Sequence, residues 1–257
     1  MPTACKLATQ VGERLLERNP LFEYFFSREA PRLAEACREM SERFLRGGRL
    51  LAFGRGPYAT DAQHVSVEFV HPVIVGKRAL PAVHVEGADV SGSLRLLSRP
   101  GDVLLAVSSA SDARTSDLLQ RAEAWGLTRL WLGAGARPPV GRAEHVVWLE
   151  DIDPAIAARS GDVVLLYHLL WELTHVVFEH PGLLEAASDC TDDVCITCSD
   201  EGRLGEVVGV RPDGQAEIRT PSGLETIDTT LIGDACPGDL VLVHAGAALC
   251  LVMKEAG

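Results

Sequence analysis

The chain has 257 residues, 47% of them hydrophobic and 23% charged, which is typical of a globular protein of one or two domains. No apolar run reaches the ~20 residues that cross a bilayer, and the N-terminal residues lack the apolar segment of a signal peptide. We therefore expect a cytoplasmic protein with no membrane contact. The net charge of −12 would repel phosphate backbones and argues against a nucleic-acid partner.

The first two thirds of the chain alternate helices and strands. Apolar residues at spacings of three and four predict amphipathic helices at 5–26 and 28–48. Short apolar runs predict strands at 49–54, 81–85, 102–109, 129–134 and 145–150, with helices between them and a last long helix at 156–180. This alternation indicates an α/β fold with a parallel five-stranded sheet, in which ligands bind at the carboxyl ends of the strands.

Two turns at those carboxyl ends carry residues suited to binding an anion. A glycine turn follows the first strand, where the backbone can approach a ligand and the next helix offers free N–H groups. A serine turn follows the third strand and opens another helix with hydroxyl groups that could contact a phosphate. The ligand-binding residues that we expect are Gly54, Arg55, Gly56, Ser108, Ser109 and Ser111.

Two helices carry the pattern His-x3-Glu-x2-His, which places the three side chains on one helix face. His64, Glu68 and His71 form the first set, and residues 168–175 repeat it in "HLLWELTH". Imidazole and carboxylate groups on one face suit metal binding or acid–base chemistry. The alternative is that His71 and His168 are ordinary surface or helix-end residues.

These motifs resemble the SIS (sugar isomerase) domain, and within it the phosphoheptose isomerases, over roughly residues 1–180 of a domain expected at 1–186. The resemblance implies aldose–ketose isomerisation of a phosphosugar of the sedoheptulose 7-phosphate type. Glu68 would move the proton between adjacent carbons and His175 would handle the oxygen. It also implies zinc held by His64, Glu68 and His175, and assembly into a homodimer or homotetramer.

The chain departs from the family pattern at several of these positions. The glycine turn differs at 55–58, and Ala110 and Ala113 replace two serines that contact phosphate in the family. Tyr167 stands where the family has a glutamine ligand, and the neighbouring His168 lies about 100° further round the helix. Two readings therefore remain for this domain, an active isomerase and an SIS domain with another ligand or without catalysis.

Charge and cysteine content both change near residue 188, which indicates a domain boundary. Residues 186–257 hold 13 acidic and 4 basic side chains, and five of the seven cysteines lie in 190–257. We expect a linker at 187–194 and a second domain at 195–257. Short alternating strands with turns at 213–214, 222–223 and 237–238 predict a small all-β barrel of the OB type.

The pair Cys195 and Cys198 allows three interpretations. A structural zinc site needs four ligands, so Cys190 and Cys236 would have to complete it. A redox pair would normally begin a helix in a βαβ unit, which is not the pattern here. The third interpretation is an open thiolate at Cys195 that binds a metal together with His244.

The blocks "CITCSDEGRLGEVVGV" and "GDLVLVHAGAAL" resemble the HypC/HupF family of hydrogenase-assembly chaperones. The resemblance implies that Cys195 and His244 transiently carry iron bearing cyanide and carbon monoxide. Its implied partners are a HypD-type scaffold and the hydrogenase large-subunit precursor. We therefore expect a nickel–iron hydrogenase maturation factor whose SIS-like domain oligomerises and binds a small anion. The alternative is a metal-dependent phosphosugar isomerase with an accessory barrel.

Overall fold

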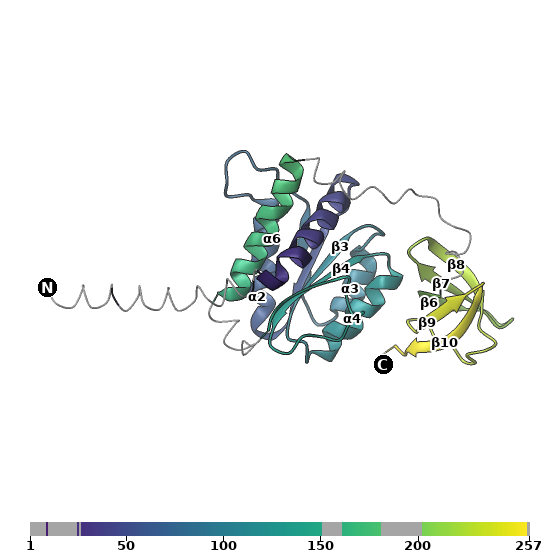
Figure 1. Cartoon of the computed structure of the whole chain (residues 1–257). Helices are drawn as coiled ribbons and strands as arrows, with labels where there is room; N and C mark the ends of the chain where they lie inside the picture. The colour runs from purple at the N-terminus through teal and green to yellow at the C-terminus, as the bar shows by residue number, and fades with distance from the viewer. Residues whose placement is uncertain (1–8, 10–24, 26, 151–160, 181–201, 256–257) are drawn as a thin grey trace.

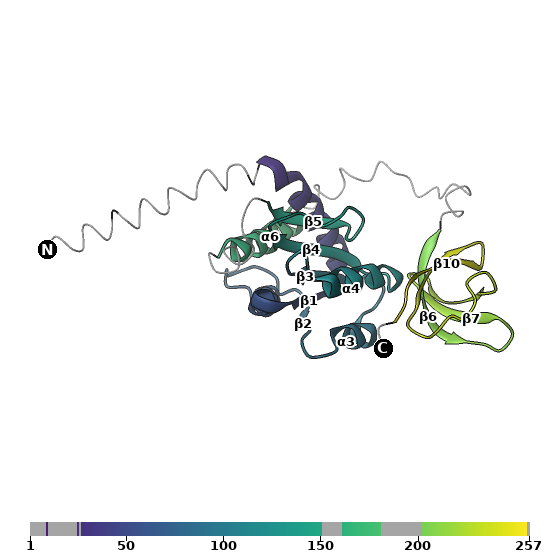
Figure 2. The same cartoon turned by 90° about the horizontal axis from the view of Figure 1, so that it is seen from below.

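A computed structural model describes residues 9, 25, 27–150, 161–180 and 202–255. It contains an α/β unit followed by a β-barrel unit, which lie side by side (Figures 1 and 2). All of the helix predicted at 5–26 except residues 9 and 25, the linker predicted at 187–194, and the pair Cys195 and Cys198 lie outside the described residues. The exact domain boundaries therefore stay a prediction.

The α/β unit is built on a parallel five-stranded sheet in the order β2-β1-β3-β4-β5, as predicted. The strands are β1 (Leu50–Gly54), β2 (Ala82–His84), β3 (Val103–Val107), β4 (Thr128–Ala134) and β5 (His145–Leu149). Successive side chains alternate between the two faces, so Leu50 and Ala52 join one core while Leu51 and Phe53 join the other. Because both faces are covered, the inner strands are continuous apolar runs.

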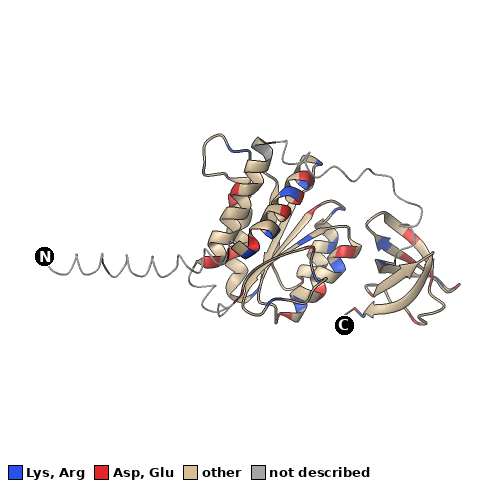
Figure 3. Ribbon diagram, in the orientation of Figure 1, with Lys and Arg blue, Asp and Glu red and all other residues tan. Residues whose placement is uncertain are grey.

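Helices cover the two faces of the sheet. A helix at 27–45 lies with α2 (Ala59–Val70) and α6 (Asp162–Glu179) over one face, and α3 (Val90–Leu97) and α4 (Ala113–Ala124) cover the other (Figure 2). Acidic and basic side chains interleave on the outer side of the helix at 27–45 (Figure 3). None of the helices in the described ranges is both long and apolar enough to cross a membrane.

The second unit is a closed five-stranded barrel in the order β10-β8-β7-β6-β9, which confirms the predicted all-β fold. Its strands are β6 (Arg203–Val210), β7 (Gln215–Thr220), β8 (Gly223–Asp228), β9 (Leu240–His244) and β10 (Ala247–Met253). The turns expected at 213–214 and 222–223 join β6 to β7 and β7 to β8. Val207, Ile218 and Val241 are among the residues that fill its interior.

The barrel packs against the face of the α/β unit formed by α3 and α4. Leu240 of β9 joins the core beneath these helices. The buried carboxylate of Glu206 accepts hydrogen bonds from Arg95 at 3.0 and 2.7 Å and from the indole of Trp125 at 2.8 Å. Arg121 of α4 donates to the backbone carbonyls of Gly238 and of residue 254 in the barrel unit. Buried polar contacts and apolar packing therefore join the two units.

Candidate functional site

The glycine turn at the end of β1 is shaped by the chain's own backbone. A Cβ atom at Gly54 would lie 2.1 Å from the carbonyl oxygen of Tyr58, and Gly56 has a φ of +59°. Both positions therefore favour glycine because the chain folds back into the short 3₁₀ helix η1 (Gly56–Tyr58) before α2. That these glycines also contact a ligand stays a prediction.

The serine turn after β3 is partly engaged in internal hydrogen bonds. Ser108 is buried, and its hydroxyl accepts from the indole of Trp131 at 3.0 Å. The hydroxyl oxygens of Ser109 and Ser111 lie 2.9 Å apart. A cavity of about 400 Å³ lies between the glycine turn and Ser108 and Ser109. The fold thus brings the two predicted anion-binding turns to one edge of the sheet.

A carboxylate already meets the N-terminus of α4 beside the serine turn. Asp112 accepts hydrogen bonds from the backbone N–H of Arg114 at 3.2 Å and from the hydroxyl of Thr115 at 3.0 Å. Its third partner is Arg55, whose Nε lies 2.7 Å from a carboxylate oxygen. Because Asp112 uses the positive end of the helix and pairs with Arg55, this turn has less capacity for an external phosphate. No local sequence pattern marks Asp112 as a partner of Arg55, because the two residues are far apart along the chain.

Three side chains from α2 and α6 form a cluster that could hold a metal ion: His64, Glu68 and His168. The distances from Glu68 Oε1 are 3.1 Å to His64 Nε2 and 3.7 Å to His168 Nε2. Donor atoms around a tetrahedral zinc ion lie about 3.3 Å apart, given bonds of about 2.0 to 2.1 Å. Two histidines and one glutamate are also a common catalytic zinc set.

Hydrogen bonding supports a cation at this cluster. His168 Nδ1 lies 2.7 Å from the carbonyl oxygen of Val164, which can only accept, so this nitrogen carries the proton. In the neutral ring the lone pair of His168 Nε2 then faces the Glu68 carboxylate, and two electron donors oppose each other. The other oxygen of Glu68 is buried and has no hydrogen-bond partner among the described residues. A divalent cation would satisfy these atoms.

The structure does not bring His175 to this cluster. Its ring nitrogens lie 2.8 Å from the carbonyl oxygens of Trp171 and Arg78, and the side chain is buried. Glu172 points to solvent, and His71 is an exposed residue that ends α2. His71 and His175 therefore do not join the cluster, and His168 occupies the place expected for His175.

Two further groups hold the ring of His64. The hydroxyl of Tyr167 lies 2.8 Å from His64 Nδ1 and also hydrogen-bonds to Asp61. Burial raises the pKa of Asp61, and burial together with the nearby carboxylates of Asp61 and Glu68 raises the pKa of Tyr167. Such outer partners fix the orientation of a metal-binding imidazole. Asp61 lies three residues before His64, so helical spacing alone could have identified it.

The metal site expected in the barrel is only partly visible. His244 is the last residue of β9 and is half-buried. Cys195 lies outside the described residues, so its distance from His244 is untested. Cys236, a candidate zinc ligand, is an exposed free thiol in the turn before β9.

Comparison with known proteins supports the α/β unit's resemblance. A phosphoheptose isomerase of Chlorobaculum parvum is 32% identical over 143 residues, covering 49% of this chain and 68% of the relative. The chain belongs to the phosphoheptose isomerase family. A phosphoheptose isomerase of Desulfovibrio desulfuricans is 29% identical over 183 residues, covering 64% of this chain and 86% of the relative. No family model matches the chain.

Solved structures support the same fold. A phosphoheptose isomerase from Francisella tularensis aligns with a TM-score of 0.55 and 16% identity, covering 66% of this chain and 98% of that one. A phosphoheptose isomerase from Neisseria gonorrhoeae aligns with a TM-score of 0.53 and 22% identity. The alignment covers 66% of this chain and 100% of that one. The likeness to this family extends over about two thirds of the chain, and the resemblance to hydrogenase-assembly chaperones stays a sequence-based prediction.

Proposed function

We propose that the α/β unit is a metal-dependent aldose–ketose isomerase acting on a phosphosugar of the sedoheptulose 7-phosphate type. The observation that carries this proposal is the buried, unpaired oxygen of Glu68 beside the imidazoles of His64 and His168. The sequence alone favoured a hydrogenase maturation factor and gave the isomerase as the alternative; the structure leads us to propose the isomerase first. The family membership supports it.

Glu68 is the group that would move the proton. Its carboxylate would take a proton from the carbon next to the sugar carbonyl and return it to the former carbonyl carbon, while the proton of the hydroxyl on the first of these carbons would pass to the former carbonyl oxygen, so that atoms and charges balance. His64, Glu68 and His168 would hold zinc, which when bound supplies polarisation of the sugar carbonyl. Tyr167 and the carbonyl of Val164 orient the two imidazoles.

His175 does not take part in proton transfer in this proposal. Both of its ring nitrogens lie against backbone carbonyls, and Arg78 lies in the segment that follows α2. The ring therefore links α6 to that segment. We expect His175→Gln to lower stability more than it lowers the intrinsic rate of proton transfer.

The test combines zinc binding with proton exchange. Zinc content is measured after dialysis, and solvent deuterium incorporation into sedoheptulose 7-phosphate is followed by NMR. Glu68→Gln should lower exchange by about 10² to 10⁴-fold, and His168→Ala should lower zinc affinity. The matched control is Glu172→Gln, which changes an exposed carboxylate on α6, the helix that carries His168. It should leave both zinc binding and deuterium exchange unchanged. Zinc binding that is independent of His168, or exchange that survives in Glu68→Gln, would overturn the proposal.

Hydrogenase maturation is our second candidate function, and it rests on different residues. The sequence resemblance of residues 195–252 and the closed barrel over β6 to β10 support it. The test is anaerobic purification with the candidate partners, followed by measurement of iron and of cyanide and carbonyl infrared bands. We expect these signals in the wild type and their loss in Cys195→Ala. Absence of iron from both proteins would reject this role.

A further inference from the structure

The two imidazoles that face Glu68 have different partners behind them. Nδ1 of His168 lies 2.7 Å from the carbonyl oxygen of Val164, which can only accept, so the proton of this ring is on Nδ1. Nδ1 of His64 lies 2.8 Å from the hydroxyl of Tyr167 instead, and a hydroxyl can either donate or accept. A further group must therefore decide which nitrogen of His64 carries the proton.

That further group is the carboxylate of Asp61, the hydrogen-bond partner of Tyr167. Asp61 is 7% exposed and lies in the first turn of α2, where the positive end of the helix dipole favours a charged carboxylate. An ionised carboxylate has no proton and can only accept. The Tyr167 hydroxyl therefore donates to Asp61, and its oxygen accepts from Nδ1 of His64. The lone pair of His64 Nε2 then faces Glu68 Oε1, 3.1 Å away.

Packing holds Tyr167 between Asp61 and His64. Its side chain is fully buried in the core that α2 and α6 share with the sheet. Its ring stacks on that of His168, with the centroids 5.0 Å apart, and meets the ring of His64 edge-on at 5.5 Å. Burial and the nearby carboxylates raise the pKa of Tyr167, so the hydroxyl keeps its proton. Tyr167 can therefore connect Asp61 to His64 without moving.

We propose that Asp61, acting through the hydroxyl of Tyr167, is a positioning residue that keeps the proton of His64 on Nδ1 and leaves Nε2 free to bind the metal. This inference rests on the proposed function, because it concerns the metal of the same site. Both histidines then present the same nitrogen to Glu68. Without Asp61 the Tyr167 hydroxyl would donate to Nδ1, and His64 would donate from Nε2 to Glu68. That hydrogen bond would close the site to a cation.

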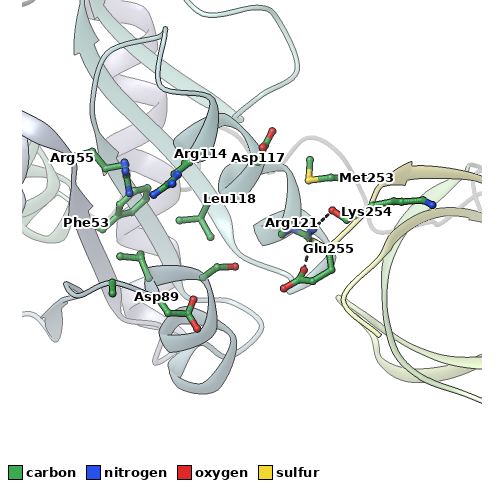
Figure 4. A pocket seen from close by; sticks show the side chains of 13 residues that line it. Phe53, Arg55, Asp89, Arg114, Asp117, Leu118, Arg121, Met253, Lys254 and Glu255 are labelled. Atoms are coloured by element: carbon green, nitrogen blue, oxygen red, sulfur yellow. Dashed lines mark hydrogen bonds and ion pairs between the residues drawn. The ribbon is translucent and has the colours of Figure 1, made fainter. Parts of the chain in front are cut away.

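The first experiment locates the proton on His64. Two-dimensional ¹H–¹⁵N NMR spectra of the metal-free full chain show which ring nitrogens of each histidine are protonated. We expect a proton on Nδ1 of His64 in the wild type and on Nε2 alone in Asp61→Ala. The control is Asp117→Ala, which should leave the His64 signals unchanged. Asp117 is an exposed carboxylate that lines a cavity of about 480 Å³ between α4 and the barrel, on the other face of the sheet (Figure 4).

The second experiment measures zinc affinity by competition with a chelator. Loss of an outer partner of a metal ligand costs about 10 to 100-fold in affinity. We expect Tyr167→Phe to lie at the lower end of this range and Asp61→Ala at the upper end, because only Asp61→Ala leaves a hydroxyl that donates to Nδ1 of His64. The double variant should bind zinc like Tyr167→Phe. If Asp61 acts only through its charge or through folding, the double variant should bind no more tightly than Asp61→Ala.

The outcomes separate this inference from the proposed function. An unprotonated Nδ1 of His64 in the wild type, or a double variant that binds zinc as weakly as Asp61→Ala, would overturn the role of Asp61. If Asp61→Ala does not fold, the wild-type spectrum alone decides. Failure of the proposed function would appear elsewhere, as zinc binding independent of His168 or as proton exchange that survives in Glu68→Gln. The spectra of the metal-free protein would still report the proton on His64 in that case.

Discussion

Glu206 is the residue whose loss should most directly weaken the contact between the two units. Its side chain is 2% exposed, and its carboxylate accepts three hydrogen bonds from Arg95 and Trp125. Arg121 lies 3.7 Å away and keeps its bonds to the barrel backbone when the carboxylate is removed. Breaking a buried ion pair costs about 3 to 5 kcal/mol. Because Arg121 retains other partners and Arg95 can turn to solvent, we expect Glu206→Ala to cost about 3 kcal/mol.

Urea denaturation followed by tryptophan fluorescence and far-UV circular dichroism measures this cost. Trp125 lies at the contact, so its fluorescence should change at lower urea in Glu206→Ala, and the barrel should separate from the α/β unit before either unfolds. The matched control is Glu225→Ala. Glu225 lies on β8, is half-exposed and pairs with Arg203 of β6, so its removal should lower the free energy of unfolding by about 1 kcal/mol or less. A cost below 1 kcal/mol for Glu206→Ala, with both signals still coincident, would refute the buried contact.

Three further predictions concern stability in acid, packing and metal retention. A hydrogen bond from His145 lowers the pKa of Glu39 from 4.5 to about 2. The stabilisation that the charged Glu39 provides is therefore complete above about pH 4.5 and is lost as the pH falls toward 2. Glu39→Gln should reduce this pH dependence of the free energy of unfolding. Gly133→Ala should cost about 3 kcal/mol, measured by urea unfolding, because the new Cβ would lie 2.3 Å from the Trp148 ring. Tyr167→Phe should weaken zinc binding about 10-fold in a competition assay, because it removes the hydroxyl that orients a ligand imidazole.

The first two of these predictions have a control within the chain. Glu42→Gln changes a carboxylate on the same helix as Glu39 and should leave the acid dependence largely as in the wild type. Gly209→Ala is the control for packing, because its Cβ would meet nothing within 4 Å. An unchanged acid profile in Glu39→Gln, wild-type stability in Gly133→Ala, or undiminished zinc affinity in Tyr167→Phe would each contradict the reasoning given for that residue.

Local sequence signals were sufficient to predict the architecture. The apolar runs around Leu50–Gly54 and Val103–Val107 lie in strands that helices cover on both faces, and such strands need no polar alternation. Asp213-Gly214 and Ser222-Gly223 mark tight turns because glycine adopts positive φ without strain, and both glycines do so in the barrel. These signals act over a few residues, so they can be read without knowing the fold.

Only the tertiary structure decided which of the predicted site residues meet. Helical spacing shows that His168 and His175 lie on one face of the last helix, but it does not show which level of that face lies beside Glu68. The two residues are about 10 Å apart along the helix axis, and the packing of α6 against α2 brings His168 to Glu68 while His175 meets backbone carbonyls. The contact between α4 and the barrel likewise joins residues more than 80 positions apart, and no local pattern encodes such a distance.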